Sequence, residues 1–239
     1  TFVGVGYEGN IVRSTDNGIN WDNATSPTAN LLYKVTFGNN TFVAVGNSGN
    51  IVRSTDNGIN WDNATSPTAN LLYGVTFGNN TFVAVGNSGN IMRSTDNGTN
   101  WDNATSSTGN HLWGVTFANN TFVAVGNSGN IVRSTDNGAS WDNVTSPTGN
   151  WLEGVTFGNN TFVGVGNNGN IVRSTDNGSS WDNATSPTSN KLYGLTFGNN
   201  TFVGVGYEGN IVRSTDNGIN WDNATSPTWR RLLGVTYLE

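Results

Sequence analysis

The side chains that could perform acid–base chemistry recur at fixed positions of a repeated sequence. Twelve aspartates fall into two series with a spacing of 40 residues, which begin at Asp16 and Asp22. The acids outside these series are Glu8, Glu153, Glu208 and Glu239. A glycosidase needs two carboxyl groups whose unlike environments separate their pKa values. Residues that share one repeat position have similar environments, so the sequence predicts no catalytic residues and a chain that is not an enzyme.

The basic residues, the single histidine and the absence of cysteine lead to the same expectation. Six of the ten Lys and Arg residues share one repeat position, and we expect them to pair with the Asp22 series: Arg13, Arg53, Arg93, Arg133, Arg173 and Arg213. His111 has no partner at ligand or triad spacing. The Asp-Asn-Gly turns lack the terminal bidentate glutamate of a calcium loop. We therefore expect no metal ion and no cofactor.

A repeat of 40 residues positions these side chains. Trp21, Trp61, Trp101, Trp141, Trp181 and Trp221 recur without insertion or deletion, so six copies account for the 239 residues. Each copy contains four β-rich runs, in the first copy 1–6, 10–14, 20–25 and 31–37, divided by Gly, Asn and Asp. The pattern predicts an antiparallel four-stranded meander. Residues 1–28 equal residues 201–228, which indicates recent amplification or repeat design.

Four-stranded repeats of this length are typical of β-propeller blades. We predict an all-β, six-bladed propeller in which residues 232–237 form the inner strand of a blade completed by residues 1–25. An open β-solenoid is the alternative, but it would require polar capping repeats, and the terminal copies resemble the middle ones. We therefore expect one domain over residues 1–237, closed as a monomer. Leu238-Glu239 is interpreted as a cloning scar.

One motif occurs in all six copies and reads Ser14-Thr15-Asp16-Asn17-Gly18-Ile19-Asn20-Trp21 in the first. The Asp can accept hydrogen bonds from turn amides, the Gly can adopt a left-handed conformation, and the Trp can cover the hairpin. The motif resembles the Asp-box of sialidase-type (BNR) propellers, with Asn or Ser where that family has Thr. The resemblance implies structural roles for the six tryptophans and for Asp16, Asp56, Asp96, Asp136, Asp176 and Asp216. It also implies a hairpin between the third and fourth strands, away from a sialidase active site.

The copies differ mainly at the positions of Ala29, Leu31 and Tyr33, which follow the linker between blades. The position of Leu31 holds Leu, His, Trp, Lys or Arg in different copies. A spacing of two places side chains on the same side of a strand, so we expect these three positions to point together. The turn at Tyr7-Glu8 also varies between copies. In a propeller this turn and the linker lie on the face opposite the Asp-boxes.

Exposed Trp and Tyr beside charged side chains are typical of recognition surfaces, although drift of exposed residues is a competing interpretation. The first hypothesis is a non-enzymatic scaffold that binds a protein or another macromolecule. The alternative is a lectin whose aromatic residues stack on sugar rings, and a sialidase-like glycosidase is third. The candidate ligand-binding residues are Leu31, Tyr33, Leu71, Tyr73, His111, Trp113, Trp151, Glu153, Lys191, Tyr193, Trp229 and Arg231.

Composition excludes several other classes of protein. The net charge of −6 argues against binding to nucleic acid, whose phosphates need clustered cations. With 34% hydrophobic and 11% aromatic residues, disorder is not expected. No apolar run approaches the ~18 residues of a membrane span. We expect a soluble protein, and the lack of cysteine does not indicate its compartment.

Overall fold

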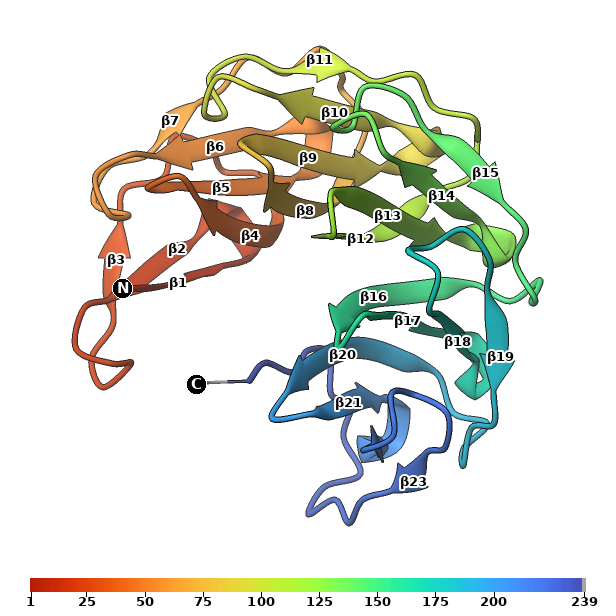
Figure 1. The fold of residues 1–239 in the computed structure, drawn as a ribbon. Helices are drawn as coiled ribbons and strands as arrows, with labels where there is room; N and C mark the ends of the chain where they lie inside the picture. Colours follow the sequence, from red (N-terminus) through yellow and green to blue (C-terminus); the bar gives the residue numbers. More distant parts are fainter. Residues whose placement is uncertain (238–239) are drawn as a thin grey trace. The chain divides into compact units, whose positions relative to one another are not determined.

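A computed structural model describes residues 1–237 as six antiparallel β-sheets with six short 3₁₀ turns and no other helix (Figure 1). Five sheets have four strands and one has three. The chain divides into two compact units, Thr1–Leu112 with Asp136–Ser140, and Trp113–Thr135 with Trp141–Glu239. Each unit is described by itself. Leu238-Glu239, interpreted above as a cloning scar, lies outside the described residues, and the expectation of one domain stays a prediction.

The strands follow one another in chain order within every sheet, which is the predicted meander. The three sheets of the first unit are formed by β1 (Phe2–Val5), β2 (Ile11–Ser14) and β3 (Asp22–Ala24); by β4 (Leu32–Gly38), β5 (Thr41–Gly46), β6 (Ile51–Ser54) and β7 (Asp62–Asn63); and by β8 (Leu72–Gly78), β9 (Thr81–Gly86), β10 (Ile91–Ser94) and β11 (Asp102–Asn103). The turns η1 (Tyr7–Gly9), η2 (Asn47–Gly49) and η3 (Asn87–Gly89) each follow the second of the four strand positions.

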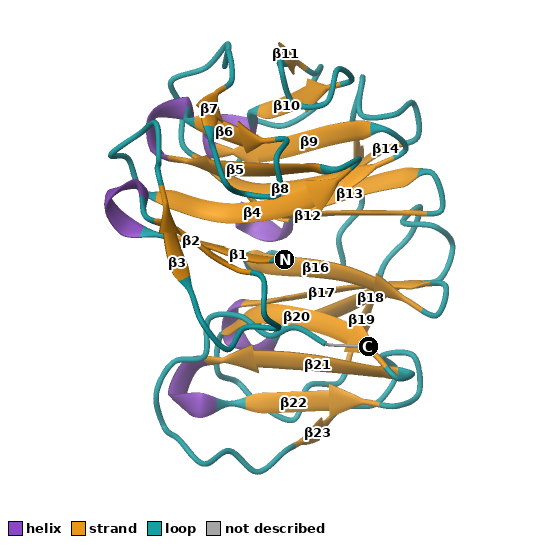
Figure 2. Ribbon diagram, turned by 90° about the vertical axis from the view of Figure 1, so that its left-hand side faces the viewer, coloured by secondary structure: helices purple, strands orange, loops and turns teal. Residues whose placement is uncertain are grey.

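The second unit has the same organisation. Its sheets are formed by β12 (Leu112–Ala118), β13 (Thr121–Gly126), β14 (Ile131–Ser134) and β15 (Asp142–Val144); by β16 (Leu152–Gly158), β17 (Thr161–Gly166), β18 (Ile171–Ser174) and β19 (Asp182–Ala184); and by β20 (Leu192–Gly198), β21 (Thr201–Gly206), β22 (Ile211–Ser214) and β23 (Asp222–Asn223). The corresponding turns are η4 (Asn127–Gly129), η5 (Asn167–Gly169) and η6 (Tyr207–Gly209). In Figure 2 the turn η6 is drawn purple at the end of β21.

Burial along the strands explains their composition. Every residue of β5 is buried, because its sheet is covered on both faces, and this strand is rich in Val and Ala. The outer strand β7 is exposed and polar. At the hairpin between β4 and β5, Asn39 and Asn40 have φ angles of 47° and 56°, a left-handed conformation that Asn tolerates better than most residues. The sequence therefore specifies each meander locally.

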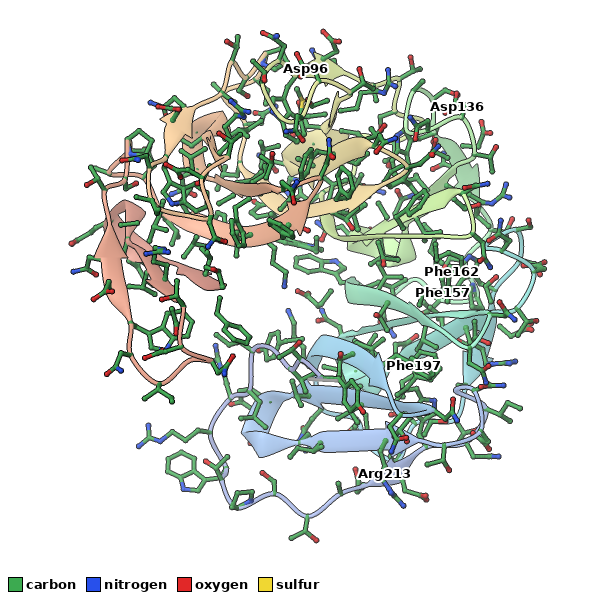
Figure 3. All side chains as sticks on the ribbon, turned by 60° about the vertical axis from the view of Figure 1, so that its left-hand side comes forward. Asp96, Asp136, Phe157, Phe162, Phe197 and Arg213 are labelled. Atoms are coloured by element: carbon green, nitrogen blue, oxygen red, sulfur yellow. The ribbon has the colours of Figure 1, made fainter. Side chains whose placement is uncertain are left out.

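Neighbouring sheets of a unit pack through aromatic side chains and glycines. In the second unit the rings of Phe157 and Phe162, on adjacent strands of one sheet, lie 4.7 Å apart, and Figure 3 shows them beside Phe197 of the next sheet. A Cβ atom on Gly158 would lie 2.0 Å from the Phe197 ring, so only glycine leaves room for this ring. The Tyr237 ring lies at the same distance from a Cβ on Gly198. The C-terminal segment thus packs along β20 as an inner strand would.

The sheet β1-β2-β3 lacks the fourth strand that the sequence predicts from residues 232–237. Residues 231–237 carry no strand assignment, although the Leu232 N–H donates to Gly206 O at 3.0 Å. Trp21 of this sheet is 46% exposed, whereas the five equivalent tryptophans are 2–6% exposed. Completion of this sheet stays a prediction. No helix within residues 1–237 is long and apolar enough to cross a membrane.

Candidate functional site

The Asp-box hairpin lies between the third and fourth strands of each four-stranded sheet, and its carboxylate is held by hydrogen bonds. Asp56 Oδ1 accepts the Asn60 N–H at 2.9 Å, and its Oδ2 accepts from Asn60 Nδ2 at 2.7 Å. Ser54 Oγ donates to Asp56 Oδ1 at 2.8 Å and accepts the Gly58 N–H at 2.9 Å. The backbone hydrogen bond from Asn60, followed by the one from its side chain, lowers the pKa of Asp56 to about 2. This carboxylate is a hairpin acceptor and is not poised as a general acid.

The Asn and Ser residues that replace the Thr of the family pattern keep the same contact. Ser180 Oγ donates to Asp176 Oδ2 at 2.6 Å, as the Asn60 side chain does to Asp56. The indole Nε1 of Trp181 donates to Gly178 O at 3.1 Å, which ties the tryptophan to its own hairpin. The departure from the family pattern therefore leaves the hairpin hydrogen bonds intact.

The expected pairing of the repeated arginines with the Asp22 series is wrong in the copies where the arginine contact is resolved. Arg133 lies opposite Asp142 in the β14–β15 pairing, but its Nε donates to Asn177 O of the next sheet at 2.9 Å. The same bond joins Arg53 to Asn97 and Arg173 to Asn217. An exposed ion pair contributes little, whereas a backbone carbonyl at a packed interface needs a donor. These arginines therefore connect sheets within a unit.

The Asp-box hairpins and the variable positions lie at opposite ends of a sheet. Asn97, in the Asp-box of its sheet, donates from Nδ2 to Thr41 Oγ1 of the preceding sheet at 2.6 Å, beside the β4–β5 hairpin. At the other end, the linker crosses the η turn so closely that a Cβ on Gly49 would lie 1.9 Å from Thr68 O. The Asn47 N–H donates to Leu31 O at 2.9 Å. Linker, turn and start of the inner strand therefore form one surface.

We call this end of the sheets in each unit the variable surface; it comprises the η turns and the positions of Ala29, Leu31 and Tyr33 in every copy. The expectation that these three positions lie on one side of a strand is wrong, because the strand does not extend over all of them. β4 begins only at Leu32, and the pairing with β5 shifts between Leu32 and Lys34, so Tyr33 lies in a β-bulge. The bulge and the neighbouring inner strands, and not strand alternation, bring the positions of Leu31 and Tyr33 together.

On the first unit, the variable surface carries a tyrosine pair. The rings of Tyr33 and Tyr73 lie 5.5 Å apart in an edge-to-face arrangement, and Tyr33 is 39% exposed. Burial, followed by the nearby Tyr7, raises the pKa of Tyr33. His111 accepts the Ser88 N–H through Nδ1 at 2.9 Å, so it is joined to η3. Leu31 and Leu71 are half-buried at the starts of β4 and β8.

On the second unit, five candidate residues form one cluster. The rings of Trp113 and Trp151 stack with centroids 6.3 Å apart and an interplanar angle of 27°. Lys191 Nζ lies 2.7 Å from Glu153 Oε1, 5.0 Å from the Tyr193 ring centroid and 6.0 Å from that of Trp151. Trp151 is 41% exposed. The cluster combines a stacked pair of aromatic rings with an ion pair.

The last copy adds a cationic cavity to the second unit. The Arg230 guanidinium lies 4.8 Å from the Trp229 ring centroid, and that of Arg231 lies 5.2 Å from the Tyr207 ring. These four residues and Glu208 line a cavity of about 490 Å³. Arg230 and Tyr207 are not among the ligand-binding residues predicted from the sequence. Each stands where most sister copies have Asn, and this difference could have identified them. Among residues 1–237, no group of three His, Asp or Glu side chains could hold a metal ion.

Comparison with known proteins places this geometry in a family context. The sequence matches the family model described as photosynthesis system II assembly factor YCF48 over residues 54–232. Among solved structures, YCF48 bound to D1 peptide has a TM-score of 0.73 and 21% identity, covering 92% of this chain and 76% of the other. The computationally designed Ika8 protein has a TM-score of 0.77 and 12% identity, with coverages of 95% and 72%.

An ancestral GH74 enzyme also matches, with a TM-score of 0.65 and 19% identity, covering 81% of this chain and 31% of that enzyme. No curated protein matches the sequence significantly. At these identities the structures establish the fold alone. They confirm the predicted all-β propeller of four-stranded blades. The family model confirms the BNR-type repeat.

Proposed function

The chain belongs to the family of photosynthesis system II assembly factor YCF48, and from this membership we propose that it is a non-enzymatic propeller scaffold that binds a polypeptide partner through its variable surface. A solved propeller of the same fold, YCF48, is bound to D1 peptide, which supports a peptide ligand for this scaffold.

The observation that carries the proposal is the cluster of Trp113, Trp151, Glu153, Lys191 and Tyr193. Large aromatic side chains that are held in place and partly exposed are the usual hot spots of protein interfaces. Sister copies fold with Leu, Tyr or His at the same positions, so folding does not require these tryptophans. We therefore assign the formation of the sheets to the positions that are identical between copies, and the contacts with the partner to the positions that differ.

The acidic side chains support a binding role over catalysis. The Asp-box carboxylates accept hairpin hydrogen bonds, and Glu153 is paired with Lys191 at 2.7 Å. A glycosidase would need two free carboxyl groups facing one sugar, one protonated and one ionised. The likeness to the GH74 enzyme, at 19% identity, concerns the fold alone.

Selection from a displayed random-peptide library tests the proposal. The unmodified chain is the bait, and a Trp113→Ala/Trp151→Ala variant is used for counter-selection. We expect peptides that bind the unmodified chain and lose binding to the variant. Ile59→Ser is the matched control, because Ile59 is 52% exposed on an Asp-box hairpin. Peptides that bind the double tryptophan variant as well as the unmodified chain, and lose binding to Ile59→Ser, would place the binding site at the opposite end of the sheets.

A carbohydrate ligand is the second candidate, favoured by the exposed aromatic pairs Tyr33–Tyr73 and Trp113–Trp151. Aromatic rings of this kind can stack on the apolar faces of sugars. A glycan array separates the two candidates: binding to defined glycans that is lost in the double tryptophan variant, without any selected peptide, would favour a lectin.

A further inference from the structure

We propose that Asn127 is a positioning residue of the variable surface, because its side-chain oxygen holds the Trp113 indole against Trp151 before any partner binds. Asn127 is the first residue of η4, and its Oδ1 accepts the Trp113 Nε1–H at 2.6 Å. This inference rests on the proposed function and adds the residue that organises its central contact.

The sister turns show that this hydrogen bond is a feature of one copy and not a requirement of the turn. Asn47, Asn87 and Asn167 begin η2, η3 and η5, and the following residue has a φ of 55–57° in each of these turns, as in η4. In these three turns the Oδ1 atom is buried and has no hydrogen-bond partner within the described chain. The residues at the position of Trp113 are Tyr33, Tyr73 and Glu153. Each of these four turns supplies an Asn acceptor, and among the four only η4 uses it for an indole.

The hydrogen bond has a consequence for binding because it fixes the rotation of the indole ring. Trp113 and Trp151 stack at 6.3 Å, and Trp151 remains 41% exposed, so the outer ring of the stack is available to a partner. A side chain that is ordered in advance does not lose its rotational freedom on binding. Removal of the acceptor should therefore weaken a peptide selected on the unmodified chain by about two- to tenfold.

Circular dichroism in the far ultraviolet tests the inference without any ligand, since two stacked indoles give an exciton couplet. Trp113→Phe defines the part of the spectrum that this pair contributes. We expect Asn127→Ala to lose most of that couplet. Asn127→Asp should keep it, because a carboxylate oxygen can accept the same N–H. The matched control is Asn87→Ala, which alters the equivalent turn and should leave the couplet unchanged.

Retention of the couplet in Asn127→Ala, or an equal loss in Asn87→Ala, would overturn the positioning role. Loss of the couplet in Asn127→Asp would show that the hydrogen bond is not what holds the two indoles together. If Asn127→Ala does not fold, the couplets of Asn127→Asp and Trp113→Phe are compared instead. Because the couplet needs no partner, it can appear as expected even if no peptide is selected. Failure of this inference is therefore distinguishable from failure of the proposed function.

Discussion

At the scale of single residues, identical amino acids have different uses according to the copy they occupy. Asn127 accepts an indole N–H, whereas the buried Oδ1 of Asn87, at the same repeat position, has no partner among residues 1–237. Trp141 is 2% exposed and packs beside Phe122, whereas Trp151 is 41% exposed on the variable surface. Residue type alone therefore does not separate structural from binding side chains, and burial with hydrogen bonding does.

Asp96→Ala should lower the free energy of unfolding by roughly 1 to 3 kcal/mol, because the hairpin amides that it accepts would lose their partner. Asp96 Oδ1 accepts the Asn100 N–H at 3.0 Å and the Thr99 N–H at 3.2 Å. Urea denaturation measures the change. Binding of any selected peptide should stay the same, and unchanged stability with reduced binding would show that the motif is a ligand site.

The Asp-box carboxylates also predict acid sensitivity. The pKa of Asp16, Asp56, Asp176 and Asp216 falls from the ordinary 3.8 to about 2 in the folded chain. A lowered folded pKa contributes stability that is complete well above pH 3.8 and is lost as the pH falls through 2. The urea midpoint should therefore stay nearly level just below pH 5 and fall progressively as the pH drops from about 4 to 2. A midpoint that is flat over this range would contradict the assigned hydrogen bonds.

Trp113→Ala and Trp151→Ala should each weaken a bound peptide by about 1 to 4 kcal/mol, as expected of hot-spot aromatics. Titration calorimetry with a selected peptide measures the loss. Trp141→Ala is the contrasting variant, because its buried ring should cost about 3 to 5 kcal/mol of stability instead. Normal binding by both surface variants would exclude the stack as the contact.

At the scale of the element, the variable surface depends on the crossing of linker and turn. Gly49 has a φ of +68°, and a Cβ there would lie 1.9 Å from Thr68 O, so backbone would meet backbone. A Cβ on Gly109, in the linker of another copy, would have no atom within 4 Å, and three sister copies carry Ala or Ser there. The two glycines therefore have different reasons to be present.

Gly49→Ala should lower the free energy of unfolding by about 2 to 4 kcal/mol through strain and displacement of the linker. Gly109→Ala should change it by less than about 0.5 kcal/mol. Thermal and urea unfolding of the two variants provide the measurement. Equal effects of the two substitutions would mean that the linker does not pack on the turn as described.

At the scale of the whole molecule, one sheet remains to be completed. The repeat register assigns the fourth strand of β1-β2-β3 to residues 232–237, whose sequence Leu-Leu-Gly-Val-Thr-Tyr follows that of the other inner strands. Single-chain completion predicts a monomer of 25.3 kDa in sedimentation equilibrium. A dimer that persists on dilution would instead indicate exchange of this strand between two copies.

The order of amino acids is sufficient to predict the repeat period, the four strands of each meander, the turns and the Asp-box hairpin. These features depend on neighbouring residues, such as Asp56 with Asn60, whose hydrogen bonds form wherever the chain turns in that way. The variable positions could also be located in advance, because six copies can be compared within one chain.

Packing between sheets selects which variable side chains meet. Trp113 contacts Trp151, and Lys191 pairs with Glu153, across neighbouring inner strands. Arg133 bonds to a carbonyl of the next sheet and not to the aspartate opposite it. Glu153 and Tyr193 lie in the β-bulges of their inner strands, and the arginine contact joins one sheet to the next. Residue periodicity does not predict these contacts, because a bulge breaks the alternation of side chains and contacts between sheets arise only when the sheets pack.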